Sequence, residues 1–115
     1  MKTKFIKSPR KYAVGLKNQV TLLDCGQIYL KPDEQITFVT PHGKKYDFTA
    51  KSWGFYVTQS MNVRLKKEGF KVALVKNSLG RFYVMAVDAK KVKDFKKYLR
   101  SDKNELVQWL DELSA

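Results

Sequence analysis

Residues 71–87, KVALVKNSLGRFYVMAV, decide the fold of this chain. Two apolar runs, 71–76 and 81–87, flank the segment Asn77-Ser78-Leu79-Gly80, whose asparagine and glycine tolerate tight turns. The pattern predicts a β-hairpin. Because both runs are apolar nearly throughout, we expect central strands that are covered on both faces.

Further strands and turns are predicted upstream of this hairpin. Runs of β-branched and aromatic residues favour strands over 12–16, 20–24, 27–30, 35–40, 45–49 and 53–58. The segments 31–34 and 41–44 contain Pro with Asp or Gly and are typical of turns. Residues 1–11 are rich in lysine and predict a basic N-terminal arm with a short pairing segment at Phe5 and Ile6. Residues 12–115 are expected to form a single domain.

Helices are predicted after Ser60 and near the C-terminus. Ser60 can cap a helix over 61–68, and Gly69 is a natural stop for it. Val92, Phe95 and Leu99 share one face of a second helix. Ser101-Asp102 is expected to start a third helix, with apolar residues Leu106, Trp109, Leu110 and Leu113. We therefore predict an α+β fold: a mostly antiparallel, partly barrel-like sheet of about five to seven strands, with one short helix after Ser60 and C-terminal helices.

The charge of the chain is its unusual bulk property. The 115 residues carry a formal net charge of +12, and the pI is about 9.8. A protein this basic attracts polyanions such as nucleic acid. Only four of its 23 cationic residues are arginines, and an AT-rich genome would produce the same lysine excess on any solvated surface. The composition therefore favours nonspecific polyanion attraction over sequence-specific readout.

Catalytic and metal chemistry are poorly supplied. His42 and Cys25 are the only residues of their kinds, which leaves no zinc ligand set and no nucleophile pattern, and we expect no cofactor. A carboxylate pair drawn from Asp24, Asp33, Asp47 and Asp88 stays open. Cys25 is expected to be a small buried hydrophobe, and the lack of a second cysteine indicates a cytoplasmic protein. No apolar run is long enough to span a bilayer.

Residues 51–58, KSWGFYVT, partly resemble the RNP1 strand of RNA-recognition and cold-shock domains. Lys51, Gly54 and Phe55 match that motif, and Trp53 supplies a further aromatic. The resemblance implies base stacking on Trp53, Phe55 and Tyr56, with Lys51 near phosphate. The alternative is that these aromatics pack in the core. Several strands precede the first helix, which departs from the βαββαβ order of the RNA-recognition family.

A dense polar set follows directly after these aromatics. Its members are Thr58, Gln59, Ser60, Asn62 and Arg64. A strand-to-helix junction needs one cap and one turn residue, so the surplus indicates a site for an anion or a sugar, with Arg64 as the clamp. The alternative is a helix cap with ordinary turn polarity.

The C-terminal helix is predicted to present a basic face opposite its apolar stripe. That face consists of Lys90, Lys93, Lys97 and Arg100, which are expected to contact phosphates. The leading hypothesis is a small, non-catalytic binding protein for nucleic acid or another polyanion. The alternatives are a pocket protein or enzyme for a phosphorylated or sugar-nucleotide ligand at 58–64, and an oligomeric scaffold that associates through its C-terminal helices. The chain also resembles small bacterial proteins of surface-polysaccharide loci, a likeness that implies no function.

Overall fold

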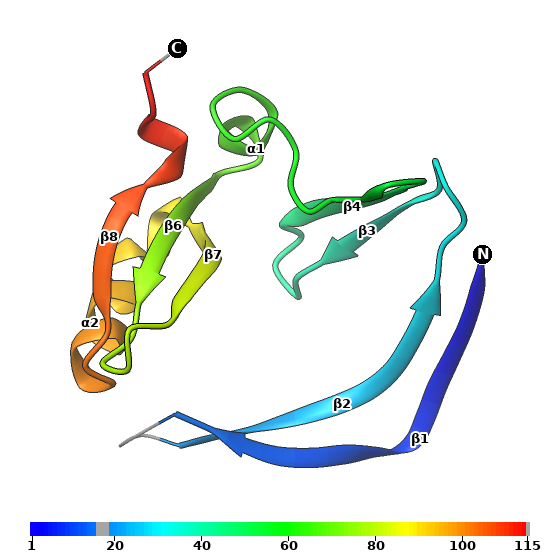
Figure 1. Ribbon diagram of the computed structural model, residues 1–115, viewed down its shortest axis with the longest axis horizontal. Coiled ribbons are helices and arrows are strands. Elements are labelled where there is room, and N and C mark those ends of the chain that lie inside the picture. The colour runs from blue at the N-terminus through cyan, green and yellow to red at the C-terminus, as the bar shows by residue number, and fades with distance from the viewer. Residues whose placement is uncertain (16–18, 115) are drawn as a thin grey trace.

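The computed structural model describes residues 1–15 and 19–114 and has an α+β architecture. Its eight strands form three small antiparallel sheets, and within the described residues no barrel closes (Figure 1). The expected single, partly barrel-like sheet was therefore wrong. The turn at 31–34 separates the N-terminal sheet of two strands from the next sheet of three. Asp33 donates its N–H to the Ala50 carbonyl, and the Glu34 carbonyl accepts from the Ala50 N–H. The turn residues thus join the second sheet and leave the first one.

The C-terminal sheet, which carries most of the core, has the strand order β7–β6–β8, with β8 at Glu105–Trp109. Strands β6 (Phe70–Lys76) and β7 (Phe82–Asp88) form the predicted hairpin, with Lys76 opposite Phe82 and Phe70 opposite Asp88. Apolar clusters cover both faces of β6, one around Ala73 and Val75 and the other around Phe70 and Val72. Strand β7 lies at the sheet edge with part of its apolar surface exposed, so the expectation of two covered faces holds for β6 only.

Helix α2 (Val92–Ser101) follows a 3₁₀ turn, η1 (Ala89–Lys91), and packs on this sheet. Its predicted stripe is confirmed: Leu99 is buried in the cluster around Val75, and Val92 and Phe95 pack against it. The helix ends in a Schellman-type turn, in which Lys103 adopts a φ of 55° and the Asn104 N–H donates to the Leu99 carbonyl at 2.8 Å. This turn reverses the chain toward β6.

The predicted third helix was wrong, because residues 105–109 form strand β8 (Glu105–Trp109) beside β6. The register shifts between Val75, which lies opposite Leu106, and Leu74, which lies opposite Gln108. Val107 is the extra residue of this bulge, and it resets the strand alternation. Leu106 and Trp109 therefore both pack against the α2-side cluster although they lie three residues apart, the spacing that resembled a helix. A short 3₁₀ turn, η2 (Leu110–Glu112), follows.

Asp111 in η2 fastens the C-terminal segment to β6. Its side chain is almost fully buried, and it accepts from the Val72 N–H at 2.8 Å and from Lys71 Nζ at 3.0 Å. Burial opposes ionisation of Asp111, but these two donors outweigh it and hold its pKa below the ordinary value. Burial likewise opposes the charge on Lys71, and its bonds to Asp111 and Glu112 nevertheless raise its pKa.

The second sheet contains β3 (Gln35–Val39), β4 (Lys45–Lys51) and β5 (Gly54–Tyr56). The turn predicted at 31–34 leads from β2 (Val20–Tyr29) into this sheet, and the turn predicted at 41–44 connects β3 to β4, but β5 is shorter than the strand predicted over 53–58. Helix α1 (Arg64–Lys67) covers only part of the predicted 61–68, because residues 61–63 form a turn and Val63 has non-helical angles. Gly69 stops the helix at a φ of 84°, as predicted.

Strands β1 (Lys2–Val14) and β2 (Val20–Tyr29) form a long two-stranded ribbon that curves beneath the other two sheets (Figure 1). Most of the predicted basic arm lies in β1. Residue 16, the end of the strand predicted over 12–16, lies outside the described residues. The two strands predicted at 20–24 and 27–30 are one, with an irregular register near Gly26. Cys25 is exposed, so its predicted burial was wrong, because nothing in the described chain covers this part of the ribbon.

Candidate functional site

A polar hollow lies where β4, β5 and the approach to α1 meet. Its volume is about 170 Å³. Of the five polar residues predicted at 58–64, four line it: Thr58, Gln59, Ser60 and Arg64. Asn62 is exposed and does not line the hollow. The local clustering in sequence is thus also a cluster in space.

Sequence reasoning missed the sheet's contribution to this hollow. Gln35, Asp47, Thr49 and Tyr56 also line it. Gln35 lies opposite Thr49 in the register of β3 and β4, so both side chains share one face of the sheet. The sequence contains a pattern that indicates this polar face: polar residues at 35, 37, 47 and 49 alternate with apolar Ile36, Phe38 and Phe48.

The charges in the hollow are paired. Arg64 Nη2 lies 3.7 Å from Asp47 Oδ2, and Thr37 Oγ1 donates to the other Asp47 oxygen at 2.7 Å. The N-cap of α1 is Val63 and not Ser60 as predicted, but Ser60 Oγ still accepts from the Arg64 N–H, the first amide of the helix, at 3.0 Å. A bound anion would therefore face the Asp47 carboxylate as well as the Arg64 guanidinium. This arrangement suits a neutral, hydroxyl-rich ligand better than a phosphate.

One buried polar atom of the hollow lacks a partner. Gln59 Oε1 is buried and has no hydrogen-bond partner among the described residues. Across the sheet, Thr49 Oγ1 donates to Gln35 Oε1 at 3.0 Å, so that acceptor is occupied. A buried acceptor without a donor calls for a water or ligand.

The three predicted stacking aromatics are exposed, with 66% of Trp53, 52% of Phe55 and 54% of Tyr56 accessible. They do not share one surface. Trp53 contacts Tyr56 edge-to-face at 5.4 Å, whereas Phe55 packs on Phe48 at 5.2 Å. Since Tyr56 lies opposite Thr49 and Phe55 opposite Ala50, adjacent residues of β4, the two rings point to opposite faces of the sheet.

Lys51, the predicted phosphate contact beside these aromatics, is already engaged. Its ammonium group donates to Asp33 and lies 5.7 Å from the centre of the Tyr56 ring. The hydrogen bond to Asp33 raises the pKa of Lys51. An incoming phosphate would compete with Asp33 for this cation.

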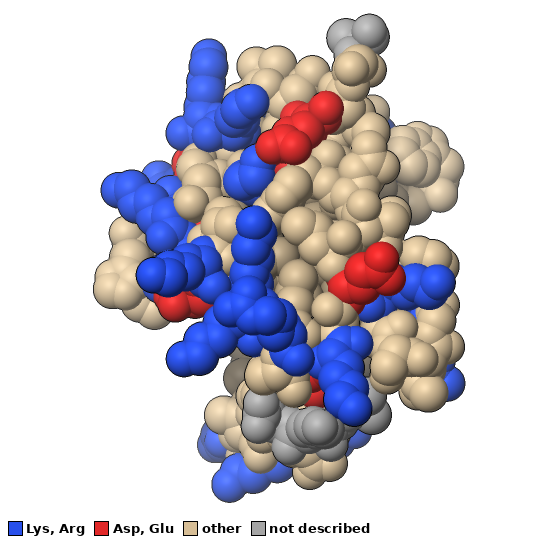
Figure 2. Space-filling view, turned by 90° about the vertical axis from the view of Figure 1, so that its left-hand side faces the viewer, with Lys and Arg blue, Asp and Glu red and all other residues tan. Residues whose placement is uncertain are grey.

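The predicted basic face lies on α2 and on the preceding turn η1, which contains Lys90, and is called the basic face of α2. Lys90, Lys93, Lys97 and Arg100 are all exposed. Figure 2 shows lysine and arginine side chains gathered on the side of the molecule where α2 and β8 lie. No ion pair within the described part of the chain involves these four residues. Their charge is therefore directed to solvent.

The four carboxylates that were open as a catalytic pair go to separate partners. Asp24 pairs with Arg10, Asp33 with Lys51, Asp47 with Arg64 and Asp88 with Lys44. The N–H of Lys90, together with the nearby lysines, holds the pKa of Asp88 below its ordinary value, although burial opposes this. Each carboxylate therefore forms an ion pair with a different cation, and these contacts do not bring two of them together as a catalytic pair.

The chain matches no protein-family model, and the comparisons found no similar curated protein and no similar solved structure. Over residues 1–15 and 19–114, no helix is long and apolar enough to cross a bilayer. In the same part of the chain, no three His, Cys, Asp or Glu side chains gather as metal ligands. Function has to be inferred from the chemistry of the surfaces themselves.

Proposed function

We propose that this protein binds nucleic acid or another polyanion without catalysis, through the basic face of α2. The observation that carries the proposal is the row of four exposed cations, Lys90, Lys93, Lys97 and Arg100, which have no ion-pair partner in the described chain. Such a row attracts phosphates by releasing their counterions, whatever the sequence of the nucleic acid.

The packing of α2 supports a surface role for this face over self-association of the helix. Val92, Phe95 and Leu99 pack on the protein's own sheet, which leaves the basic side outward. The segment expected to form a further helix for oligomerisation is strand β8. We also infer a cytoplasmic location from the single, exposed thiol of Cys25.

The test is binding of a 15-nucleotide single strand, and of heparin, measured by fluorescence anisotropy at several salt concentrations. If all four cations contact phosphates, the log–log slope for the single strand is about −2.8, at about −0.7 per contact. Affinity then falls roughly fifty-fold between about 50 and 200 mM salt. Absence of salt-dependent binding to both probes refutes the proposal.

A matched pair of variants separates the α2 face from bulk charge. One variant changes Lys90, Lys93, Lys97 and Arg100 to Glu; the other changes the exposed Lys2, Lys4, Lys7 and Lys11 of β1 to Glu. Both lower the formal net charge equally. We expect the first to abolish binding and the second to weaken it only modestly, with the melting transition of the α2 variant nearly unchanged. Equal losses would mean that net charge, and not this face, attracts the polyanion.

The polar hollow at residues 58–64 supports a second candidate function, a pocket or enzyme site for a sugar, or for the sugar part of a sugar nucleotide whose diphosphate lies outside the hollow. Its specific support is the buried, unpartnered Gln59 Oε1 beside the Arg64–Asp47 pair. Monosaccharides and a uridine diphosphate sugar can be titrated while amide chemical shifts are followed. Shifts around 58–64 that Arg64→Ala removes support the site. The matched control is Arg10→Ala, a similarly exposed arginine paired with Asp24.

A further inference from the structure

A larger cavity lies beyond the C-terminal end of α2, apart from the polar hollow. Its volume is about 430 Å³, within the usual range for small-molecule pockets. One wall comes from the start of β7 and the residue before it: Arg81, Tyr83 and Met85 alternate onto the same face as the buried Val87. Strand β7 extends past the helix that covers Val87, so the face is left open at Arg81 and Tyr83.

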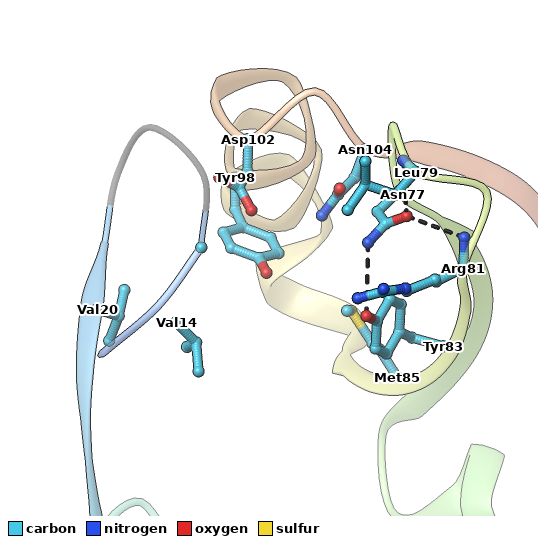
Figure 3. A pocket seen from close by; sticks show the side chains of 11 residues that line it. Val14, Val20, Asn77, Leu79, Arg81, Tyr83, Met85, Tyr98, Asp102 and Asn104 are labelled. Carbon is cyan, nitrogen blue, oxygen red and sulfur yellow. Dashed lines mark hydrogen bonds between the residues drawn. The ribbon is translucent and has the colours of Figure 1, made fainter. Parts of the chain in front are cut away.

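The opposite wall comes from α2 and the turn that ends it. Tyr98 lines the cavity from the flank of the helix, between its basic face and its packed stripe. Lys103 in its left-handed conformation then turns the chain so that the side chain of Asn104 points into the cavity (Figure 3). The third side is apolar and is formed by Val14 and Val20 at the end of the β1–β2 ribbon.

The polar groups of the cavity differ in what they already bind. Asn77 Oδ1 accepts from the N–H groups of Leu79 and Arg81, and its Nδ2 lies 3.5 Å from the Tyr83 hydroxyl. Asn77 therefore shapes the turn. Asn104 Oδ1, in contrast, is buried and has no hydrogen-bond partner among the described residues. The cavity thus offers the unsatisfied Asn104 acceptor at its inner wall, and the buried Asp102 side chain also lines it.

We propose that this cavity binds the base of a nucleotide, with its phosphate near Arg81 or on the basic face of α2. A base is flat, largely apolar on its faces and carries N–H groups on its edge. Its faces match the walls of Tyr98 and Met85, and an edge N–H satisfies Asn104 Oδ1. A sugar would place hydroxyls against these apolar walls, and a simple anion would leave most of the cavity unfilled.

This inference deepens the proposed polyanion-binding function and rests on it for the strand-bound case. It also moves the proposed base-binding site from the aromatics around β5 to the cavity beside Tyr98. Figure 1 places α2 and the sheet that carries β4 on opposite sides of the molecule, so the predicted stacking residues Trp53 and Tyr56 are remote from the α2 cations. Tyr98 belongs to the cationic helix itself. The base and its phosphate can thus meet one continuous region of the protein.

The test compares single strands of fifteen dA, dC or dT nucleotides with an abasic strand of the same length and charge. At least one base-carrying strand should bind more tightly than the abasic strand. Tyr98→Ala should weaken that strand about fivefold to a hundredfold and leave the abasic strand unchanged, as loss of one stacked base predicts. The matched control is Tyr29→Ala on β2, a tyrosine of nearly equal exposure, which should change neither.

Asn104→Ala is the second variant, because its unpartnered Oδ1 can be removed without breaking a hydrogen bond of the described fold. It should weaken the same strand and lower the preference for one base over another. Equal binding of base-carrying and abasic strands, or equal weakening of both by Tyr98→Ala, overturns the inference.

Free nucleotides separate the two possible sources of the base. The monophosphates AMP, CMP and TMP are titrated into the wild type and into Tyr98→Ala by calorimetry. Binding that Tyr98→Ala removes, together with no binding of any strand, assigns the cavity to a free nucleotide and refutes the strand-binding function. Salt-dependent strand binding that is indifferent to bases and to Tyr98 keeps the function and refutes the cavity.

Discussion

Removing the carboxylate of Asp111 should destabilise the protein much more than removing its neighbour Glu112. Both side chains bond to Lys71 Nζ, at 3.0 and 3.1 Å, but Asp111 is 3% exposed and the Glu112 side chain is 59% exposed. Asp111→Ala also leaves the buried Val72 N–H without its acceptor, the Asp111 carboxylate, which lies 2.8 Å away in the wild type. A buried donor left without an acceptor costs about 1–3 kcal/mol, and the lost ion pair adds up to about 1 kcal/mol.

The expected loss for Asp111→Ala is therefore about 1–4 kcal/mol, a fall in Tm of roughly 5–15 °C for a chain of this size. Glu112→Ala should cost a small part of that, because an exposed ion pair contributes little. Urea unfolding followed by tryptophan fluorescence measures both, since Trp109 packs beside Lys71. Equal losses in the two variants would show that the buried hydrogen bond does not fasten the C-terminal segment.

The same pair predicts a pH dependence with a definite sign. The pKa of Asp111 is lowered in the folded state, so its stabilisation is present above its unfolded value of about 3.9 and is lost as pH falls through the folded value. The pKa of Lys71 is raised, so its contribution is present below about 10.4 and is lost as pH rises further. The stability gap between wild type and Asp111→Ala should be constant near neutrality and shrink in acid. A gap that persists unchanged below about pH 3 contradicts the assignment.

Three backbone and capping changes give further predictions. Lys103→Gly should stabilise the protein by about 0.5–1 kcal/mol in urea unfolding, since Lys103 has a φ of 55° that glycine adopts freely. Ser60→Ala should lower stability by about 1 kcal/mol, because it removes the acceptor of the Arg64 N–H. Gly26→Ala should loosen the β1–β2 ribbon, since an added Cβ would lie 2.1 Å from the Lys4 carbonyl oxygen at a φ of 134°. Faster amide hydrogen exchange confined to β1 and β2 would report that change.

Each of these three has an outcome that contradicts it. A loss of stability in Lys103→Gly would mean that the lysine side chain makes a contact worth more than the relief of its backbone. A free energy of unfolding that is the same in Ser60→Ala and the wild type would show that the hydrogen bond from the Arg64 N–H to Ser60 does not stabilise the start of α1. Amide exchange in Gly26→Ala that matches the wild type would show that the ribbon accommodates a side chain at this bulge.

Local periodicity was sufficient for the elements whose neighbours in space are also neighbours in sequence. The hairpin of β6 and β7 needs only two apolar runs and a tight turn, and the stripe of Val92, Phe95 and Leu99 needs only helical spacing. Gly69 likewise stops α1 because a positive φ is a property of that residue itself. These features followed from the sequence because the physics that selects them acts within a few residues.

Strand β8 shows where local reasoning was insufficient. Leu106 and Trp109 are three residues apart, which matches one face of a helix and equally matches one face of a bulged strand. Only the open edge of β6 favours the strand, because residues 105–109 can pair with it and bury both side chains in the same cluster. The sequence of the segment alone contains no information about that edge.

The sequence by itself determined the composition of the candidate surfaces: the basic face of α2 and the polar set at 58–64 are both local in the chain. The tertiary structure decided what those groups meet. The segment that leads into α1 lies beside β4, where Arg64 meets Asp47 at 3.7 Å, so the predicted anion clamp is already part of an ion pair. Arg81, Tyr98 and Asn104 line one cavity only because β7 extends beyond the end of α2 and the left-handed turn at Lys103 directs Asn104 inward. Its walls come from separate segments, and packing between segments depends on the whole chain, which no local pattern records.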